Sequence, residues 1–300
     1  MIYIYTENFI FIGKAKTIVK KLLGRGARGP QAVLNSLLRG LKELGTEYRL
    51  DEPIKAPVAV AYVLSGAKTL RWAIQQKKAG RIKKLVAGPN IVVFPGDDGA
   101  ILTDSAIDVV VVPSEWVKEK YELLAPHLRS KIKIWPAGVK IPDLPREEKI
   151  WDFLIYNKAG RSPLLKDIER HLADQHFKVN IFEYGKFSQS DYFQALGRSR
   201  YEIYLSPSES QGLAMFEAWA RGVPTLVWDR GFYEYRGFKL ARRGIACPYL
   251  NQQTGNSFKD FTDFKEALPK FVDASYAPRA YIEQNFTNKI CASRYLELAA

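Results

Sequence analysis

The alternation of short apolar runs with longer helical patterns along the 300 residues is the feature that most constrains the fold. Runs rich in Val, Ile and Tyr predict strands, and apolar residues spaced three or four apart predict helices. In the first half the predicted strands are 2–5, 58–64, 91–94, 109–112 and 132–135, and the predicted helices are 31–44, 68–79 and 115–124. Strands that alternate with helices are typical of parallel sheets. The sequence therefore predicts an α/β protein.

The second half repeats the alternation. Its predicted strands are 151–156, 179–182, 203–205 and 225–228, and its predicted helices are 163–175, 190–198, 213–220, 261–273 and 287–298. Between the halves, residues 136–145 contain three prolines and precede a charged run at 146–149, which indicates a linker. We therefore expect two domains, at 1–145 and 146–286, with a C-terminal helix in 287–300 that packs back on the first.

Composition and charge narrow the class of protein. No apolar run approaches the about 20 residues that span a bilayer, and the start of the sequence lacks the pattern of a secretory signal. Two cysteines and three isolated histidines do not make a disulfide framework or a zinc site. We therefore expect a cytoplasmic protein. The net charge is +10 in residues 1–145 and +3 in residues 146–300, which favours anionic partners or a solvated basic surface.

The segment 206–229, SPSESQGLAMFEAWARGVPTLVWD, is the most informative part of the chain. A loop with Glu209 and Gly212 runs directly into a predicted helix, after one predicted strand and before another. Unpaired backbone N–H groups and the positive end of the helix dipole at such a point suit a phosphate. Glu217 lies further along the same helix, where its apolar neighbours favour a buried position. The segment therefore predicts a site for a phosphate-bearing ligand between two carboxylates.

This segment resembles the E-x7-E motif of the retaining glycosyltransferases with the GT-B fold, of the group 1 or family 4 type. The two glutamates, the G-L after the first and the G-V-P before the next strand all match the pattern of that family. The stretch 26–45 is similar to the glycine-rich loop and first helix of its acceptor domain, and the segments 110–121 and 136–139 resemble the part of the chain that leads into the interdomain linker. The resemblance therefore runs from about residue 26 to 229. It implies two Rossmann-like domains that face each other across a cleft, an acceptor-binding domain at 1–145 and a domain at 146–286 that binds the nucleotide-sugar donor.

The resemblance implies transfer of a sugar from a nucleoside diphosphate to an acceptor with retention of configuration. It assigns Glu209 to the transferred sugar, Glu217 to the ribose, and the backbone of residues 211–213 to the diphosphate. The residues expected to bind the donor are Glu217, Ser210, Gln211, Gly212, Leu213, Asn157, Arg28 and Gly29. Gln211 stands where the family usually has Phe, so the side-chain contact expected there differs.

Catalysis of this transfer needs positive charge, because negative charge grows on the departing phosphate. Lys158 and Arg161 follow the strand predicted at 151–156 and resemble the basic pair of the family; with Glu209 they are the expected catalytic residues. The sequence holds no evident acidic cluster for a metal, and we expect no cofactor and no metal, as in GT-B enzymes. Retention is then compatible with attack on the face from which the phosphate leaves.

The acceptor is the least constrained part of the reaction. Asp97 and Asp98 would contact it or cap a helix. The stretches 14–28 and 68–84 interleave cations with apolar residues, which favours an anionic membrane surface and a lipid-linked or envelope glycan over nucleic acid. Two other functions stay open: a nucleic-acid-binding protein, including a DNA-modifying glucosyltransferase, and a nucleotide-sugar-binding module without turnover.

Overall fold

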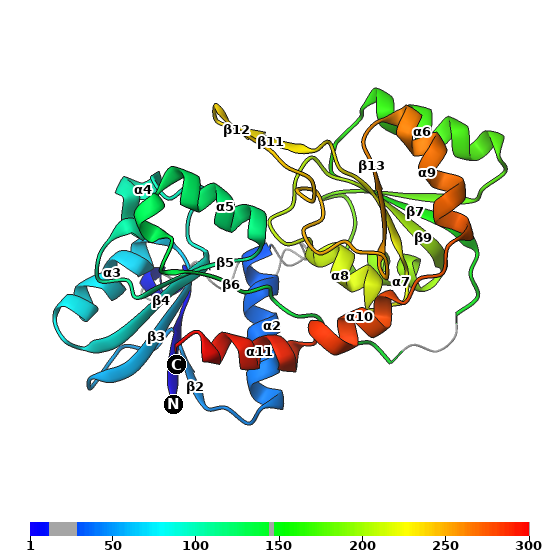
Figure 1. The fold of residues 1–300 in the computed structure, drawn as a ribbon. Coiled ribbons are helices and arrows are strands. Elements are labelled where there is room, and N and C mark those ends of the chain that lie inside the picture. The colour runs from blue at the N-terminus through cyan, green and yellow to red at the C-terminus, as the bar shows by residue number, and fades with distance from the viewer. Residues whose placement is uncertain (12–28, 144–146, 300) are drawn as a thin grey trace. The chain divides into compact units, whose positions relative to one another are not determined.

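The computed structural model describes residues 1–11, 29–143 and 147–299. The chain divides into two compact units, one formed by residues 1–138 with 288–300 and the other by residues 139–287. The division falls within the proline-containing segment after β6, and the last helix returns to the first unit (Figure 1).

The first unit is built on a six-stranded parallel sheet with the order β2-β1-β3-β4-β5-β6. Its strands are β1 (Ile2–Tyr5), β2 (Tyr48–Leu50), β3 (Val58–Ser65), β4 (Ile82–Asn90), β5 (Val109–Val112) and β6 (Ile132–Ile134). Its helices are α2 (Gly29–Glu43), α3 (Ala67–Lys78), the short α4 (Asp97–Ala100), α5 (Glu115–Leu124) and α11 (Asn288–Glu297). The apolar stripe of α2 is buried, as the leucine spacing predicts.

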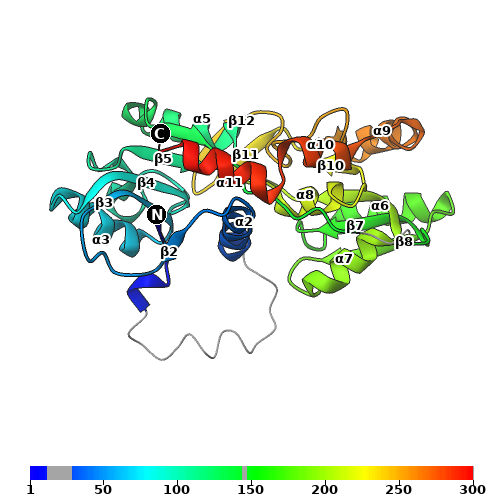
Figure 2. The same cartoon turned by 90° about the horizontal axis from the view of Figure 1, so that it is seen from below.

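The C-terminal helix α11 packs against α2 at very short range (Figure 2). A Cβ at Gly40 would lie 2.1 Å from the backbone oxygen of Asn288, so glycine is needed there for the two helices to approach. Ser36 Oγ donates a hydrogen bond of 3.0 Å to Asn288 Oδ1, and Trp135 Nε1 donates one of 2.7 Å to the carbonyl of Cys291. Residues from the end of the chain therefore complete the core of the first unit.

The second unit has a five-stranded parallel sheet with the order β13-β10-β9-β7-β8. Its strands are β7 (Trp151–Asn157), β8 (Val179–Glu183), β9 (Ser199–Leu205), β10 (Thr225–Trp228) and β13 (Gly255–Phe258), and an antiparallel hairpin, β11 (Phe232–Tyr235) with β12 (Phe238–Ala241), follows β10. Its helices are α6 (Pro163–Asp174), α7 (Gln189–Gly197), α8 (Leu213–Trp219), α9 (Phe261–Asp273) and α10 (Pro278–Asn285). Because all five strands are parallel, their carboxyl ends share one edge.

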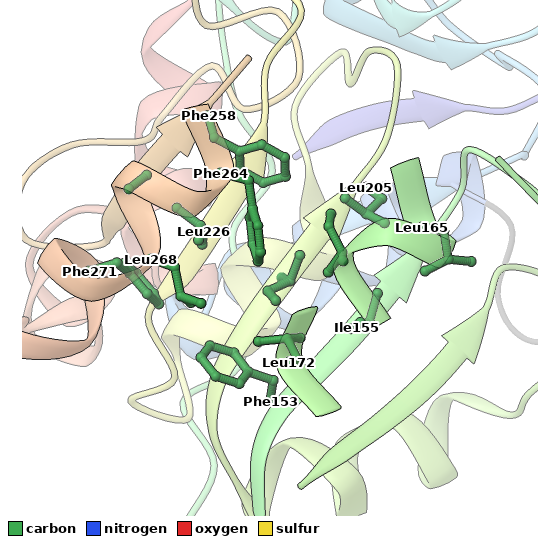
Figure 3. Packing of buried hydrophobic residues seen from close by; sticks show 13 residues of the cluster. Phe153, Ile155, Leu165, Leu172, Leu205, Leu226, Phe258, Phe264, Leu268 and Phe271 are labelled. Carbon is green, nitrogen blue, oxygen red and sulfur yellow. The ribbon is translucent and has the colours of Figure 1, made fainter. Parts of the chain in front are cut away.

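Alternation along the strands gives this sheet two different faces. On one face the strands pack against α6 and α9 in an apolar cluster (Figure 3) made by Phe153, Ile155, Leu165, Ile168, Leu172, Ile203, Leu205, Leu226, Phe258, Phe264, Ala267, Leu268 and Phe271. On the other face Tyr156 stacks on Tyr204, with ring centroids 4.8 Å apart, and contacts Tyr192 of α7. The first face is an apolar core with the Tyr201 ring at its border, and the second carries hydroxyl groups toward the carboxyl edge.

One predicted strand is wrong, and five strands of the structure were not predicted. Residues 91–94 form a loop in which Val93 is 47% exposed, and the strand in this part of the chain is β4, directly before them. The sequence IKKLVAGPN of β4 contains two lysines, a glycine and a proline, which obscured it. The hairpin β11–β12 and the edge strands β2 and β13 were also missed.

Candidate functional site

The carboxylate of Glu209 is the centre of the candidate site. It lies in the loop between β9 and α8, and its side chain is 13% exposed. One oxygen, Oε1, accepts hydrogen bonds from Lys158 Nζ at 2.6 Å, Tyr204 Oη at 2.8 Å and Ser206 Oγ at 3.0 Å. The backbone N–H of Glu209 donates to the carbonyl of Ile245. Both the side chain and the backbone of this residue are therefore held in place by the protein itself.

Strand register explains why Lys158 meets Glu209. Tyr156 and Asn157 of β7 pair with Tyr204 and Leu205 of β9, so the two loops leave the sheet side by side. The N–H of Lys158 donates to the carbonyl of Leu205, and its ammonium nitrogen lies 4.8 Å from the ring centroid of Tyr184. The sequence predicted both residues as site residues, and the fold brings them into an ion pair.

Asn157 shapes the loop that carries Lys158. Its side chain is buried, its Oδ1 accepts from the N–H of Ala159 at 3.0 Å, and its Nδ2 donates to the carbonyl of Gly160 at 2.9 Å. Arg161 follows in the same loop and is exposed, without a hydrogen bond or ion pair to any other residue that the structure describes. The two cations of this loop therefore differ: Lys158 is paired with Glu209, and Arg161 is exposed to solvent.

The turn into α8 depends on Gly212. This residue has φ of 89° and ψ of 53°, in the left-handed region, and it directly precedes the helix. A Cβ there would also lie 2.4 Å from Cε of Met215. Before it, Ser210 is exposed and Gln211 is buried, and Leu213 begins the helix. The backbone of the predicted diphosphate loop is thus tightly turned, and α8 itself has only seven residues.

Glu217 lies on the second turn of α8 and is half-buried, so the expectation of a buried side chain is wrong. Its Oε1 accepts a hydrogen bond of 2.7 Å from Nε2 of Gln189, the first residue of α7. Burial is the largest cause that raises the pKa of Tyr156, and the charges of Glu209 and Glu217 raise it further. Tyr156 is therefore within electrostatic reach of both carboxylates.

Comparison with solved structures identifies the architecture. No family model matches the sequence, and no curated protein matches it either. Three similar structures each cover 99% of this chain and 98% of their own: the lipopolysaccharide outer core galactosyltransferase WaaB (TM-score 0.63, 12% identity), HepE of Anabaena in complex with UDP (0.59, 10%) and a sucrose-phosphate synthase from Thermosynechococcus elongatus (0.58, 11%). All three are GT-B glycosyltransferases. The chain has the GT-B fold.

Two predicted donor-binding residues belong to the first unit of this GT-B chain. Arg28 lies outside the described residues. Gly29 is the first residue of α2 and is exposed, and a Cβ there would meet nothing within 4 Å. Asp97 accepts a hydrogen bond from the N–H of Phe94, which closes the loop after β4, and Asp98 has φ of 54°. Contacts of these four residues with substrates stay predictions.

The basic stretch 68–84 does not form the mixed apolar and cationic surface expected of it. Leu70 and Ile74 of α3 are buried in the core, and Trp72 packs against the rings of Tyr5 and Phe9. Its lysines also find acidic partners, such as Asp108 at 2.7 Å from Lys77. The other stretch, 14–28, lies outside the described residues. Among the helices that the structure describes, none is long and apolar enough to cross a membrane.

Sequence reasoning missed a buried carboxyl beneath the site. Glu202 of β9 is fully buried, and burial raises the pKa of its carboxyl to about 8 despite hydrogen bonds from Tyr192 Oη at 2.7 Å and Thr225 Oγ1 at 3.3 Å. The charge of Glu217 raises this pKa further. A charged residue inside the apolar run YEIYL was the signal that could have revealed it.

Tyr204 and Ser206 were also missed. Both donate hydrogen bonds to Glu209, and no pattern in the sequence points to them. Within residues 1–11, 29–143 and 147–299, no group of three His, Cys, Asp or Glu side chains is arranged to hold a metal ion. The site is thus a fixed carboxylate with a lysine beside it, at the carboxyl edge of a parallel sheet, where ligands bind in open α/β sheets.

Proposed function

We propose that this chain is a hexosyltransferase that moves a sugar from a nucleoside diphosphate sugar to an acceptor. The observation that carries the proposal is the Glu209 carboxylate, held by Lys158, Tyr204 and Ser206 at the carboxyl edge of the second sheet. A fixed carboxylate can orient sugar hydroxyls, and a lysine next to it can bind a phosphate. The UDP in the HepE structure and the galactosyltransferase activity of WaaB support a nucleotide sugar as donor.

In this proposal the donor lies along the carboxyl edge of the second unit. Its diphosphate binds Lys158, Arg161 and the turn formed by Ser210, Gln211, Gly212 and Leu213. The transferred sugar binds Glu209, and the ribose binds Glu217. The ribose hydroxyls then replace Gln189 as hydrogen-bond donors to the Glu217 carboxylate. Gly29, Arg28 and the loop amide of Asn157 complete the donor contacts that the family resemblance implies.

The transfer that we propose retains the anomeric configuration and requires no metal. The bond between C1 of the sugar and the phosphate oxygen breaks, and the acceptor oxygen forms its bond to C1 on the same face. The acceptor proton passes to the departing phosphate oxygen. Lys158 stabilises the negative charge on the diphosphate, and Glu209 stabilises the oxocarbenium-like sugar.

For the acceptor we propose a lipid-linked or cell-envelope glycan, with the protein in the cytoplasm or at the inner face of the membrane. WaaB, named as an enzyme of the lipopolysaccharide outer core, supports a glycan of this kind. An acidic-lipid liposome sedimentation assay in low and high salt tests the membrane part. Equal sedimentation with neutral and acidic liposomes would exclude it.

A thermal-shift screen of UDP-, GDP-, TDP- and ADP-sugars tests the donor. A ligand at about 100 times its dissociation constant adds about 2.7 kcal/mol to the stability of the folded state, which raises the unfolding temperature by several degrees. Hydrolysis or transfer of the stabilising sugar then establishes turnover. Stabilisation without turnover by any acceptor would indicate a silent binding module, and no stabilisation alongside salt-sensitive binding of duplex DNA would indicate a nucleic-acid-binding protein.

A further inference from the structure

Arg230 lies beside the Glu209 loop, on the side away from Lys158. In the sheet order β13-β10-β9-β7-β8, β9 has β7 on one side and β10 on the other. Lys158 follows β7, the Glu209 loop follows β9, and Arg230 follows β10, all at one edge. Arg230 Nη2 lies 3.5 Å from the carbonyl of Pro207, which belongs to the Glu209 loop. Two cations therefore flank that loop.

The two cations differ in how their charge is balanced. Lys158 lies 2.6 Å from Glu209, whereas Arg230 has no carboxylate within 4 Å among the described residues. Its Nε–H group is buried and has no hydrogen-bond partner. The adjacent Asp229 does not neutralise it by contact, because its two carboxylate oxygens accept from the N–H groups of Gly231 at 3.2 Å and Gly244 at 2.6 Å.

Neighbouring rings hold the Arg230 guanidinium in place. Its carbon lies 4.5 Å from the ring centroid of Phe232 and 5.7 Å from that of Trp228. A guanidinium that is stacked on aromatic rings keeps its N–H groups directed outward in a fixed plane, which suits phosphate, sulfate or carboxylate oxygens. The side chain is half-buried, so part of it is open to a ligand.

The hairpin that begins at Arg230 adds positive charge next to it. Residues 230–243, RGFYEYRGFKLARR, contain five cations and one acid, a net charge of +4. Figure 1 shows the β11–β12 hairpin extending away from the parallel sheet of its unit. Asp229 accepts hydrogen bonds from Gly231 and Gly244, which brings the two ends of this segment together. Arg243, at the C-terminal end of the segment, is exposed.

We infer that Arg230, with the base of the basic hairpin, binds an anionic group on the sugar acceptor: a phosphate, sulfate or carboxylate carried by the glycan. This inference rests on the proposed function, because it takes the sugar to lie at Glu209 and the donor diphosphate to lie at Lys158. The acceptor then approaches the sugar from the β10 side. An acidic glycan matches the excess of positive charge there, which a neutral one would leave uncompensated.

Binding of defined pentasaccharides by titration calorimetry tests the inference. The probes are a heparin-derived sulfated pentasaccharide and neutral maltopentaose, each measured with and without the nucleoside diphosphate found in the donor screen. Wild type is compared with Arg230→Met, which keeps packing against Phe232, with Arg230→Lys, which keeps the charge, and with Lys270→Met. Lys270 is an exposed cation on α9 and serves as the matched control.

We expect Arg230→Met to weaken binding of the sulfated pentasaccharide about tenfold, since a charge-assisted contact is lost. The affinity of Arg230→Lys should lie between those of wild type and Arg230→Met, and that of Lys270→Met should equal wild type. Nucleotide affinity and unfolding temperature should stay as in wild type.

Equal affinity of wild type and Arg230→Met for the sulfated probe would overturn the inference. So would an equal loss of nucleotide affinity, which would place Arg230 in the donor site, or displacement of the glycan by duplex DNA at lower concentration. Failure of every nucleotide to bind, with Arg230-dependent glycan binding intact, would instead overturn the proposed transfer.

Discussion

The two glutamates of the E-x7-E motif lie eight residues apart in the sequence but in different surroundings. Glu209 precedes α8 and is fixed by donors from the loop after β7, from β9 and from its own loop. Glu217 is half-buried on α8 and faces an amide of α7. An amide partner exchanges readily for a ligand hydroxyl, but a carboxylate held at several points does not move. The comparison teaches that one motif can supply both a fixed carboxylate and an adaptable one, which matches the roles that we propose for them in reaction and in binding.

The strongest test of this comparison is Glu209→Gln. The amide keeps the shape of the side chain and removes its charge, so we expect turnover to fall by about 10²–10³-fold, as for other fixed electrostatic groups. Affinity for the free nucleoside diphosphate should change less than twofold. Initial rates and calorimetric titration measure the two quantities. A large loss of nucleotide affinity would mean that the roles of the two glutamates are reversed.

Lys158→Ala should lower the rate by about 10²-fold, because the departing diphosphate loses its positive partner. Arg161→Ala is the matched comparison from the same loop, and its exposed position predicts a smaller loss, about tenfold or less. Both variants are assayed with and without EDTA. Activity lost on chelation and restored by magnesium or manganese would assign the charge stabilisation to a metal.

Glu217→Ala should weaken nucleotide binding by about tenfold, the lower end of the range for a charge-assisted hydrogen bond, because the side chain is only half-buried. Gln189→Ala removes the partner from α7 and should leave nucleotide affinity unchanged or slightly higher. Calorimetry on the two variants separates a ribose contact from a structural one. Unchanged affinity in a folded Glu217→Ala protein would remove this residue from the donor site.

Tyr204→Phe sharpens the comparison further, because it removes one of the donors to Glu209 and leaves the ring stacked on Tyr156. We expect kcat to fall several-fold, about the effect of one hydrogen bond, with nucleotide affinity unchanged. Tyr201→Phe is the control from the same strand, since its hydroxyl donates to the carbonyl of Val272 on the other face. Equal kcat in the two variants would show that Tyr204 does not position the carboxylate.

The smallest effect on activity is expected at Glu202, whose influence is on stability. Because the folded pKa of about 8 is above the unfolded value, the folded state keeps the proton that the unfolded state loses. Stability should therefore fall as pH rises from about 4.5 to 8, by at most about 1.4 kcal/mol per pH unit. Glu202→Gln should flatten this dependence in urea unfolding at pH 5, 6.5 and 8. An unchanged slope would show that Glu202 is ionised in the fold.

Much of the fold was predictable because buried parallel strands are short apolar runs. Residues 2–5, 109–112 and 225–228 were predicted with the bounds that the structure has, and so was the helix at 261–273. The prediction failed at β4, which has Lys83 and Lys84 directly after its first residue and Gly88 and Pro89 directly before its last. Local composition there favours a loop, and only the neighbouring strands β3 and β5 make it a strand.

The sequence allowed several residues of the candidate site to be predicted, but not the contacts that they make with one another. Glu209 and Lys158 each follow a predicted strand, but 51 positions separate them, and their ion pair depends on β7 and β9 being neighbours. Tyr204 and Glu202 lie inside a strand whose composition is typical of core. The charge of Glu202 within an apolar run marked it as unusual, whereas nothing marked Tyr204 as a partner of Glu209. Glu217 was expected to be buried because the helix around it is apolar, yet the residue facing it is the polar Gln189.

The two hydrogen bonds of Asp229 make the anchorage of the hairpin independent of the hairpin's length. Since its two oxygens hold the N–H groups of Gly231 and Gly244, the path between these glycines can grow, shrink or change sequence while its anchorage stays the same. The Glu209 loop is tied to the chain just outside this path, at Ile245. The hairpin can therefore be replaced between the two glycines without changing how it is anchored. If it binds the acceptor as we infer, we expect a grafted hairpin to alter acceptor preference and to leave the proposed transfer chemistry intact.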